Sequence, residues 1–167
     1  MIASPPRLRS PRDLLLDDLG RLLTVESMLA KVMLPKLVQE VQDDQLKGAL
    51  EQHLDETRQH AEHLTQAFAE LEEEPTGKEA PGLEGLKQEH DEGIGQVAPS
   101  LRDVFDAGAA IGSEHYEIAI YSGAVLLAEG AGEKKAANLL KTNLDQEFAA
   151  LRKLEALAER LAQPEAE

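Results

Sequence analysis

The sequence predicts an all-α protein built around four long helices. Three observations support this prediction. Leucine, alanine and glutamate dominate the composition, and aromatic residues make up only 3% of it, a mixture that favours helices over strands. Four segments repeat apolar residues at alternating steps of three and four, which is the spacing of one face of a helix. One long polar connection separates the second of these segments from the third.

The first helix is expected to start at Ser10, which can act as its N-cap. Pro11 then fits the first helical position, and Asp13 stands where a capping box needs an acid. Pro35 is expected to kink or end the regular helix before the pattern fades near Val41. The apolar positions of this helix are Leu15, Leu19, Leu22, Leu29 and Met33.

The second helix is expected to start near Asp43 and Asp44, because acidic residues stabilise a helix N-terminus. Its apolar face is formed by Leu46, Leu50, Thr57, Leu64, Ala67 and Leu71. The polar connection over residues 72–99 contains Pro75, Gly77, Pro81 and Gly82. We expect a short helix over residues 83–92 within this connection.

The third helix is expected to start at Ser100, with Asp103 completing a second capping box, and to run to about Glu129. The residues that follow the apolar spacing of three and four on this helix are Ala107, Ile111, Ile118, Tyr121 and Val125. Glycines at 130 and 132 then break the helix. The fourth helix is expected over residues 133–162, with its apolar face formed by Leu140, Leu144, Leu151, Leu154, Ala158 and Leu161.

The lengths of the connections predict the topology. Helices one and two are joined tightly, as are helices three and four, so each pair should form an antiparallel hairpin. Only the middle connection is long enough to run the length of a bundle. Two hairpins joined by one long crossover form the ferritin-like arrangement of an antiparallel four-helix bundle. We therefore expect one domain over residues 12–162, with tails at 1–11 and 163–167.

The charge of the chain excludes several classes of function. The formal net charge is −15, which repels phosphate backbones and anionic lipid surfaces, so we expect no binding to nucleic acid or membranes. No apolar run approaches the ~20 residues that span a bilayer. The N-terminal residues do not resemble a secretory signal, and we expect a cytoplasmic protein. Because there are no cysteines, any metal ion must be bound by carboxylate and imidazole, which suits iron, manganese or zinc.

Polar residues interrupt the apolar pattern of all four helices. Taken singly, a glutamate at such a position is usually partly exposed or lies at an oligomer contact, and a lone helical histidine is usually structural. We assign that structural role to His63 and His90, and a packing or dimer role to His115. The remaining polar residues are expected at the same level of the bundle on all four helices. They form one set, namely Glu26, His53, Glu56, His60, Glu114, Glu117 and Glu147.

The spacing of the glutamates predicts a metal centre. Glu26 and Glu56 are 30 residues apart (56 − 26), and so are Glu117 and Glu147 (147 − 117). Two hairpins with this matched offset place each carboxylate pair at one level. Several ionised carboxylates in one core would cost several kcal/mol each. Two divalent cations would neutralise most of that charge, as in the dinuclear iron or manganese sites of helical bundles.

The same residues resemble a known family. The matching segments are residues 22–26, 34–36, 53–60, 114–119 and 145–147. They are similar to the YciE/YciF-type ferritin-like family of bacterial stress-associated proteins. The resemblance implies a bundle, often dimeric, with a rubrerythrin-like carboxylate site, but no established reaction. The sequence departs from the usual Glu-x-x-His pattern, because Gln59 follows Glu56 and Ala150 follows Glu147 at that spacing.

Two functions are compatible with these residues. In a metalloenzyme, two iron or manganese ions bridged by Glu56 and Glu147 would reduce peroxide or dioxygen, and zinc could occupy the site in crystals. Glu26 with His53 or His60 would bind one ion, and Glu114 with Glu117 the other. Tyr121, one turn after Glu117, would donate a hydrogen bond or a redox equivalent, or would simply fill the core.

The alternative is a non-enzymatic stress or interaction protein with a structural or vestigial metal site. In either case we expect a homodimer, because small residues on helix three allow another helix to approach closely. These residues are Gly108, Ala109, Ala110 and Gly112.

Overall fold

The computed structural model describes residues 8–163, and all regular structure in this range is helical, without strands. The elements are α1 (Pro11–Met28), η1 (Leu29–Met33), α2 (Leu34–Glu40), α3 (Asp44–Glu70), α4 (Pro81–Gly93), η2 (Ile94–Gln96), η3 (Pro99–Leu101), α5 (Arg102–Gly130) and α6 (Lys134–Leu161). The prediction of an all-α chain with a short helix in the long connection is confirmed. Most of the two expected tails lies outside the described residues.

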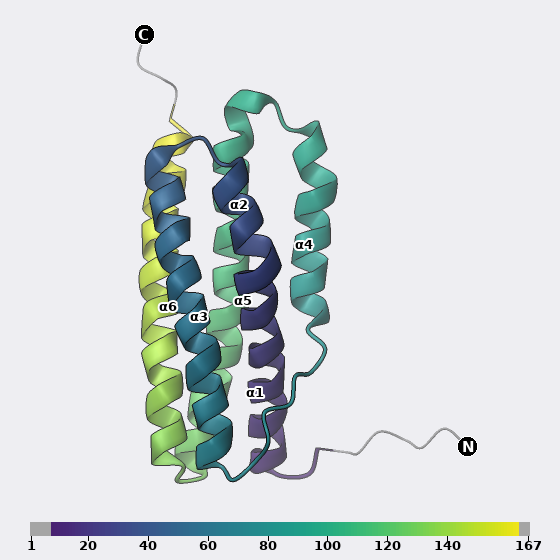
Figure 1. Ribbon diagram of the computed structural model, residues 1–167, viewed down its shortest axis with the longest axis vertical. Coiled ribbons are helices and arrows are strands. Elements are labelled where there is room, and N and C mark those ends of the chain that lie inside the picture. The colour runs from purple at the N-terminus through teal and green to yellow at the C-terminus, as the bar shows by residue number, and fades with distance from the viewer. Residues whose placement is uncertain (1–7, 164–167) are drawn as a thin grey trace, which may run out of the picture.

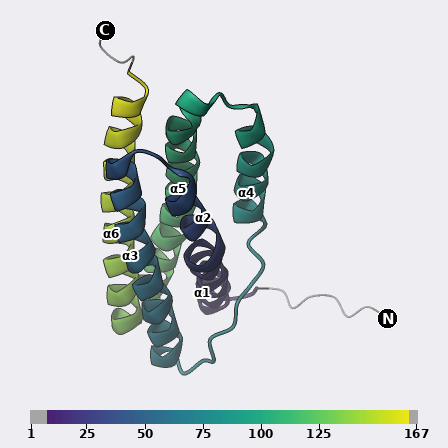
Figure 2. The same cartoon turned by 45° about the horizontal axis from the view of Figure 1, so that its top comes forward.

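The long helices α1, α3, α5 and α6 lie side by side (Figures 1 and 2). The chain forms α1 and α3 as one pair and α5 and α6 as a second pair. In Figure 1, α1 runs upward, α3 and α5 run downward, and α6 runs upward again. The connection after α3 returns along the molecule through α4 before α5 begins. Helix α1 packs against α3 and α5, and α6 packs against the same two helices. The chain therefore forms two antiparallel hairpins joined by one long connection.

Side-chain caps fix the start of α1, as the sequence predicts, and the start of α3, where the sequence predicts acidic residues at the N-terminus. The backbone N–H of Asp13 donates to the Ser10 hydroxyl at 3.0 Å, and the Ser10 N–H donates to the Asp13 carboxylate at 2.9 Å. The Asp43 carboxylate accepts from the backbone N–H groups of Gln45 and Leu46. These bonds satisfy donors that have no partner within the helix.

The start of α5 differs from the predicted capping box. No side chain caps this helix, which begins at Arg102. The Asp103 carboxylate instead accepts from the backbone N–H groups of Gln42 at 3.0 Å and Asp43 at 2.7 Å. Asp103 therefore joins the first turn of α5 to the turn between α2 and α3, a contact between distant parts of the chain that outcompetes the local cap.

Pro35 does not end the first long helix. The π-helical segment η1 precedes it, and the helix continues through α2 to Glu40. A proline inside a helix lacks an N–H group and its ring clashes with the carbonyl one turn earlier. The wider π-helical turn accommodates this clash, so the helix continues past the proline.

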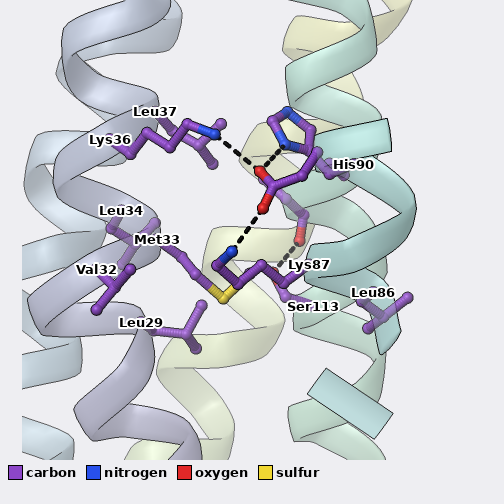
Figure 3. Close-up of a pocket in the computed structure, with 13 residues that line it drawn as sticks. Leu29, Val32, Met33, Leu34, Lys36, Leu37, Leu86, Lys87, His90 and Ser113 are labelled. Atoms are coloured by element: carbon purple, nitrogen blue, oxygen red, sulfur yellow. Dashed lines mark hydrogen bonds and ion pairs between the residues drawn. The ribbon is translucent and has the colours of Figure 1, made fainter. Parts of the chain in front are cut away.

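Charged contacts attach α4 to its neighbours around a small cavity of about 40 Å³ (Figure 3). The Asp91 carboxylate lies 2.8 Å from Lys36 Nζ of α2 and 2.5 Å from Lys87 Nζ of α4. The hydrogen bonds from these two ammonium groups lower the pKa of Asp91. His90 Nε2 lies 2.7 Å from a carboxylate oxygen of buried Asp106 on α5, which supports the structural role assigned to His90.

The buried apolar side chains form two clusters with polar residues between them. The first cluster contains Leu15, Leu19, Leu22, Leu64, Ala67, Ala124 and Leu140, among others. The second contains Val25, Leu29, Leu46, Leu50, Ala107 and Leu154, among others. On each of the four long helices, the glutamates and histidines singled out by the sequence fall where one cluster gives way to the other.

Candidate metal centre

Six of the predicted site residues meet inside the protein, between the two apolar clusters. They are Glu26, His53, His60, Glu114, Glu117 and Glu147, and each is at most 3% exposed. Helix α1 contributes one of them, α3 and α5 two each, and α6 one. Each occupies a position where helical periodicity points a side chain inward, as the sequence predicts.

The six residues form two donor groups. His53, Glu114, Glu117 and Glu147 each offer one atom, and these atoms lie within 4.8 Å of one another. Glu26, His60 and Glu147 form a second group by the same measure. Glu147 belongs to both groups, so its two oxygens lie between the two candidate positions. The set of carboxylate and imidazole donors matches the ligands of dinuclear bundle sites.

Many donor atoms of this cluster have no hydrogen-bond partner. In the described chain, nine buried side-chain atoms lack one, and all nine belong to these six residues. His53 Nε2 lies 2.9 Å from Glu114 Oε1, and His60 Nδ1 lies 2.8 Å from Glu147 Oε1. These are ion-pair distances without hydrogen-bond geometry at the ring nitrogens. Buried polar atoms are almost always hydrogen-bonded. Nine buried nitrogen and oxygen atoms without hydrogen-bond partners, facing one another, therefore fit a site that binds cations.

Burial changes the protonation of the carboxyl groups. Burial raises the pKa of Glu117 well above its ordinary value, and the nearby Glu147, Glu26 and Glu114 carboxylates raise it further. Burial also raises the pKa of Glu26 and Glu147. Without a cation the cluster therefore retains protons. A divalent ion would displace them, because metal ligands must be deprotonated.

The two histidines respond to the same charges in the opposite sense. Burial alone would lower the pKa of His60, but the Glu147 and Glu26 carboxylates outweigh it and raise the pKa to about 10. Burial likewise opposes protonation of His53, yet Glu114 above all raises its pKa well above the ordinary value. In the metal-free protein, two imidazolium ions therefore supply positive charge that metal ions would otherwise supply.

Glu56 lies apart from the other predicted ligands. Its side chain is 22% exposed, and it belongs to neither donor group. One carboxylate oxygen accepts from Gln52 Nε2 at 2.8 Å, and the other lies 3.9 Å from His53 Nδ1. The contact with His53 is the main reason that the pKa of Glu56 is lowered. The structure thus places Glu147 between the two groups and Glu56 at their edge, and a ligand role for Glu56 stays a prediction.

Tyr121 contacts the cluster directly. It is fully buried, and its hydroxyl donates to Glu26 Oε1. The same hydroxyl accepts from Asn143 Nδ2 at 3.0 Å, and Asn143 Oδ1 lies 2.6 Å from His63 Nδ1. Tyr121 therefore orients Glu26. Asn143 of α6 orients Tyr121 in turn, and the partly exposed His63 contacts Asn143.

Two residues that support the ligands, Gln146 and Asn143, are not among those predicted from the sequence. Gln146 Oε1 lies 2.9 Å from His60 Nε2, so this ring nitrogen donates and Nδ1 faces Glu147 and Glu26. Asn143 is fully buried, whereas Leu144, expected on the apolar face, is only partly buried. The spacing from Leu140 through Asn143 to Glu147 gives steps of three and four, and this signal could have located Asn143.

The comparisons with known proteins agree with this architecture. A family model described as "Domain of unknown function (DUF892)" matches residues 10–167. The chain belongs to the DUF892 family. It is 33% identical over 156 residues to Protein YciF of Escherichia coli (strain K12), which covers 90% of this chain and 92% of YciF. The resemblance to YciF-type proteins seen in the sequence is thereby confirmed.

Solved structures of similar chains have the same fold. YcfI from Rhodopseudomonas palustris superposes with a TM-score of 0.87 at 34% identity, over 91% of this chain and 97% of its own. The E. coli stress protein YciF gives a TM-score of 0.85 at 31% identity, over 92% and 97%. A Xanthomonas campestris protein, at 22% identity and a TM-score of 0.71, shares the fold. Among the described residues, we find no helix that is long and apolar enough to cross a membrane.

Proposed function

We propose that this DUF892 protein is a ferritin-like four-helix bundle that binds two divalent metal ions, iron or manganese, in its core. The nine buried donor atoms without hydrogen-bond partners carry this proposal. They divide into two groups that share Glu147, which is the arrangement that a dinuclear site requires. The two hairpins and the long crossover support the ferritin-like topology.

The ligands would be divided between two positions. His53, Glu114 and Glu117 would bind one ion, Glu26 and His60 the other, and Glu147 would bridge them. A pair of iron or manganese ions would supply redox chemistry toward peroxide or dioxygen. The protein would hold the carboxylates at fixed positions, keep most bulk water out, and retain a proton on the Tyr121 hydroxyl beside Glu26. Burial and the Glu26 carboxylate raise the pKa of Tyr121 well above its ordinary value, so this proton stays in place.

The proposed biological setting follows from the relatives. The E. coli relative is named a stress protein, and removal of a small oxidant in the cytoplasm would protect the cell under stress. The experiment is to purify the protein without chelators, measure its metal content, and follow peroxide consumption by metal-loaded and metal-free samples. Peroxide loss that depends on iron or manganese and disappears in Glu147→Gln would support the enzyme.

A non-enzymatic role is the second candidate, and one observation favours it. The group formed by Glu26, His60 and Glu147 offers only three residues, and Glu56 does not complete it. A site with so few ligands would serve the fold rather than a reaction. Bound metal that raises the melting temperature, without any peroxide consumption, would favour this role over the enzyme.

The proposed form in solution is a homodimer through α5. Between residues 104 and 128, the acidic side chains of α5 are Asp106, Glu114 and Glu117, each at most 2% exposed. The surface of this stretch therefore lacks ionised carboxylates, on a chain of net charge −15. Two copies that meet through this stretch would bring no exposed α5 carboxylates together. Gly108 is exposed on it, as is Leu126 at 70%.

Light scattering at micromolar concentration tests the dimer. The expected mass is that of two chains for the wild type. Leu126→Lys should give a single chain, because it places two ammonium groups at the contact. A wild-type mass of one chain would contradict the dimer.

A further inference from the structure

A cavity between α3 and α6 leads from the surface to the cluster. Its volume is about 190 Å³, and His53 and Glu56 are among the residues that line it. Three alanines from the two helices, Ala49, Ala149 and Ala150, also line it. Small side chains at facing positions leave the space between the helices unfilled. The cavity therefore reaches a donor group whose other members, Glu114, Glu117 and Glu147, are at most 1% exposed.

A chain of polar contacts crosses this cavity from one helix to the other. Lys153 Nζ of α6 donates to Gln52 Oε1 of α3 at 2.8 Å. Gln52 Nε2 donates to Glu56 Oε1 at 2.8 Å. The second oxygen of Glu56 lies 3.9 Å from His53 Nδ1. Glu56 thus lies between the solvent-exposed pair Lys153 and Gln52 and the buried ring nitrogen Nδ1 of His53.

We propose that this cavity is the entry route for divalent cations, with Glu56 as the residue that first binds an ion and passes it to His53. The inference rests on the proposed metal centre. It accounts for the position of Glu56, which is close to His53 yet outside both donor groups. Glu56 is a partly exposed carboxylate beside a ring nitrogen that has no hydrogen-bond partner.

The charges around the opening of the cavity determine whether each side chain favours or opposes the entry of a cation. The Glu56 carboxylate attracts a cation, and the net charge of −15 concentrates cations around the whole protein. The Lys153 ammonium opposes entry, because it lies at the same opening and repels a cation. Lys153 also donates to Gln52, which in turn donates to Oε1 of Glu56. Oε2 of Glu56, the oxygen nearer to His53, would receive the entering cation.

The decisive test is the rate of metal uptake. Metal-free protein is mixed rapidly with cobalt(II), and binding is followed by the visible absorption of the bound ion. Ala149 is exposed on α6, so Ala149→Leu should narrow the opening without disturbing the core. We expect uptake and release to slow several-fold together, with the dissociation constant unchanged, because a narrower passage hinders both directions equally.

A matched variant controls for the added side chain. Ala156 is exposed on the same helix and does not line the cavity, and Ala156→Leu should bind cobalt(II) at the wild-type rate. Glu56→Gln should slow uptake roughly tenfold, in the range expected for electrostatic steering of ions, while two ions still bind. Lys153→Gln should accelerate uptake.

The outcomes separate this inference from the metal centre itself. If the wild type binds no cobalt(II), both proposals are overturned. If it binds cobalt(II) and Ala149→Leu binds it at the wild-type rate, only the entry route is overturned. Loss of one bound ion at equilibrium in Glu56→Gln would overturn the transfer role and place Glu56 among the ligands.

Discussion

The two histidines of α3 lie seven residues apart (60 − 53) and have opposite surroundings. At the His60 end, Gln146 contacts the ring at Nε2, and Tyr121 and Asn143 hold Glu26. At the His53 end, neither ring nitrogen has a hydrogen-bond partner, and a cavity reaches the ring. One end of the cluster is held by a second layer of polar side chains, and the other is open.

This difference indicates that the two ends of the site have different roles, ligand orientation at the His60 end and access at the His53 end. Polar partners behind a ligand fix its orientation and its basicity. The cavity would provide the access that metal ions require under the proposed entry route. A single helix achieves both because its two inward turns face different neighbours on α6, with Gln146 and Asn143 at one level and two alanines at the other.

Removal of the shared ligand should have the largest effect. Glu147 belongs to both donor groups, so Glu147→Ala should abolish occupancy by two ions. Glu56→Ala should retain two ions, because Glu56 belongs to neither group. Metal content after loading with manganese(II) measures both. Two ions retained in Glu147→Ala, or one lost in Glu56→Ala, would contradict the roles proposed for these residues.

The pH dependence of stability should differ between the metal-free and metal-loaded forms. The raised pKa of Glu117 contributes stability that is present below its ordinary value of 4.5 and lost as the pH rises through the folded pKa. For His60 the loss runs from 6.5 to about 10. The melting temperature of the metal-free protein should therefore fall as the pH rises from 5 to about 9.

Metal ions should reverse this trend, because their binding releases protons and strengthens as the pH rises. The gain in melting temperature from manganese(II) should therefore grow across the same range. Glu117→Gln, which cannot ionise, should flatten the acidic part of the metal-free curve. A metal-free melting temperature that rises with pH would show that the cluster is not protonated as described.

Loss of one hydroxyl should affect only the supported end. Tyr121→Phe leaves Glu26 Oε1 without its donor, and we expect a loss of about 1–3 kcal/mol in the free energy of unfolding of the metal-free protein. Binding of one ion should weaken by about 10–100-fold, the usual effect of losing a residue behind a metal ligand. The other ion should bind as before.

Urea unfolding and manganese(II) titration measure these two effects. Tyr116→Phe is the matched control, because Tyr116 is only partly buried and belongs to neither donor group. Equal weakening of both ions in Tyr121→Phe would show that the two ends do not differ as the structure indicates.

The sequence predicts the helices and most of the cluster because both depend on local periodicity. Glu26 and Glu147 interrupt a regular apolar spacing, and both are fully buried. Periodicity is less informative for Glu56, which shares a broad face with His53 and His60. The buried positions of α3 step from His53 through Thr57 to His60, so Thr57 rather than Glu56 occupies the inward position.

Contacts between distant segments account for most of the remaining differences. Asp103 has the spacing of a capping residue, but it bonds to Gln42 and Asp43, 61 and 60 residues away. Gln146 also looks like a surface residue until α3 brings His60 beside it. Such partners depend on the packing of helices, which local spacing does not reveal.

Titration of the metal-free protein with manganese(II) tests the central claim most directly. Stoichiometry is measured by calorimetry, and the melting temperature is followed in the same samples. We expect two ions per chain and a rise in melting temperature, with about 2.7 kcal/mol of stabilisation at a hundredfold excess over the dissociation constant. Absence of binding by manganese(II) and by iron(II), with an unchanged melting temperature, would contradict it.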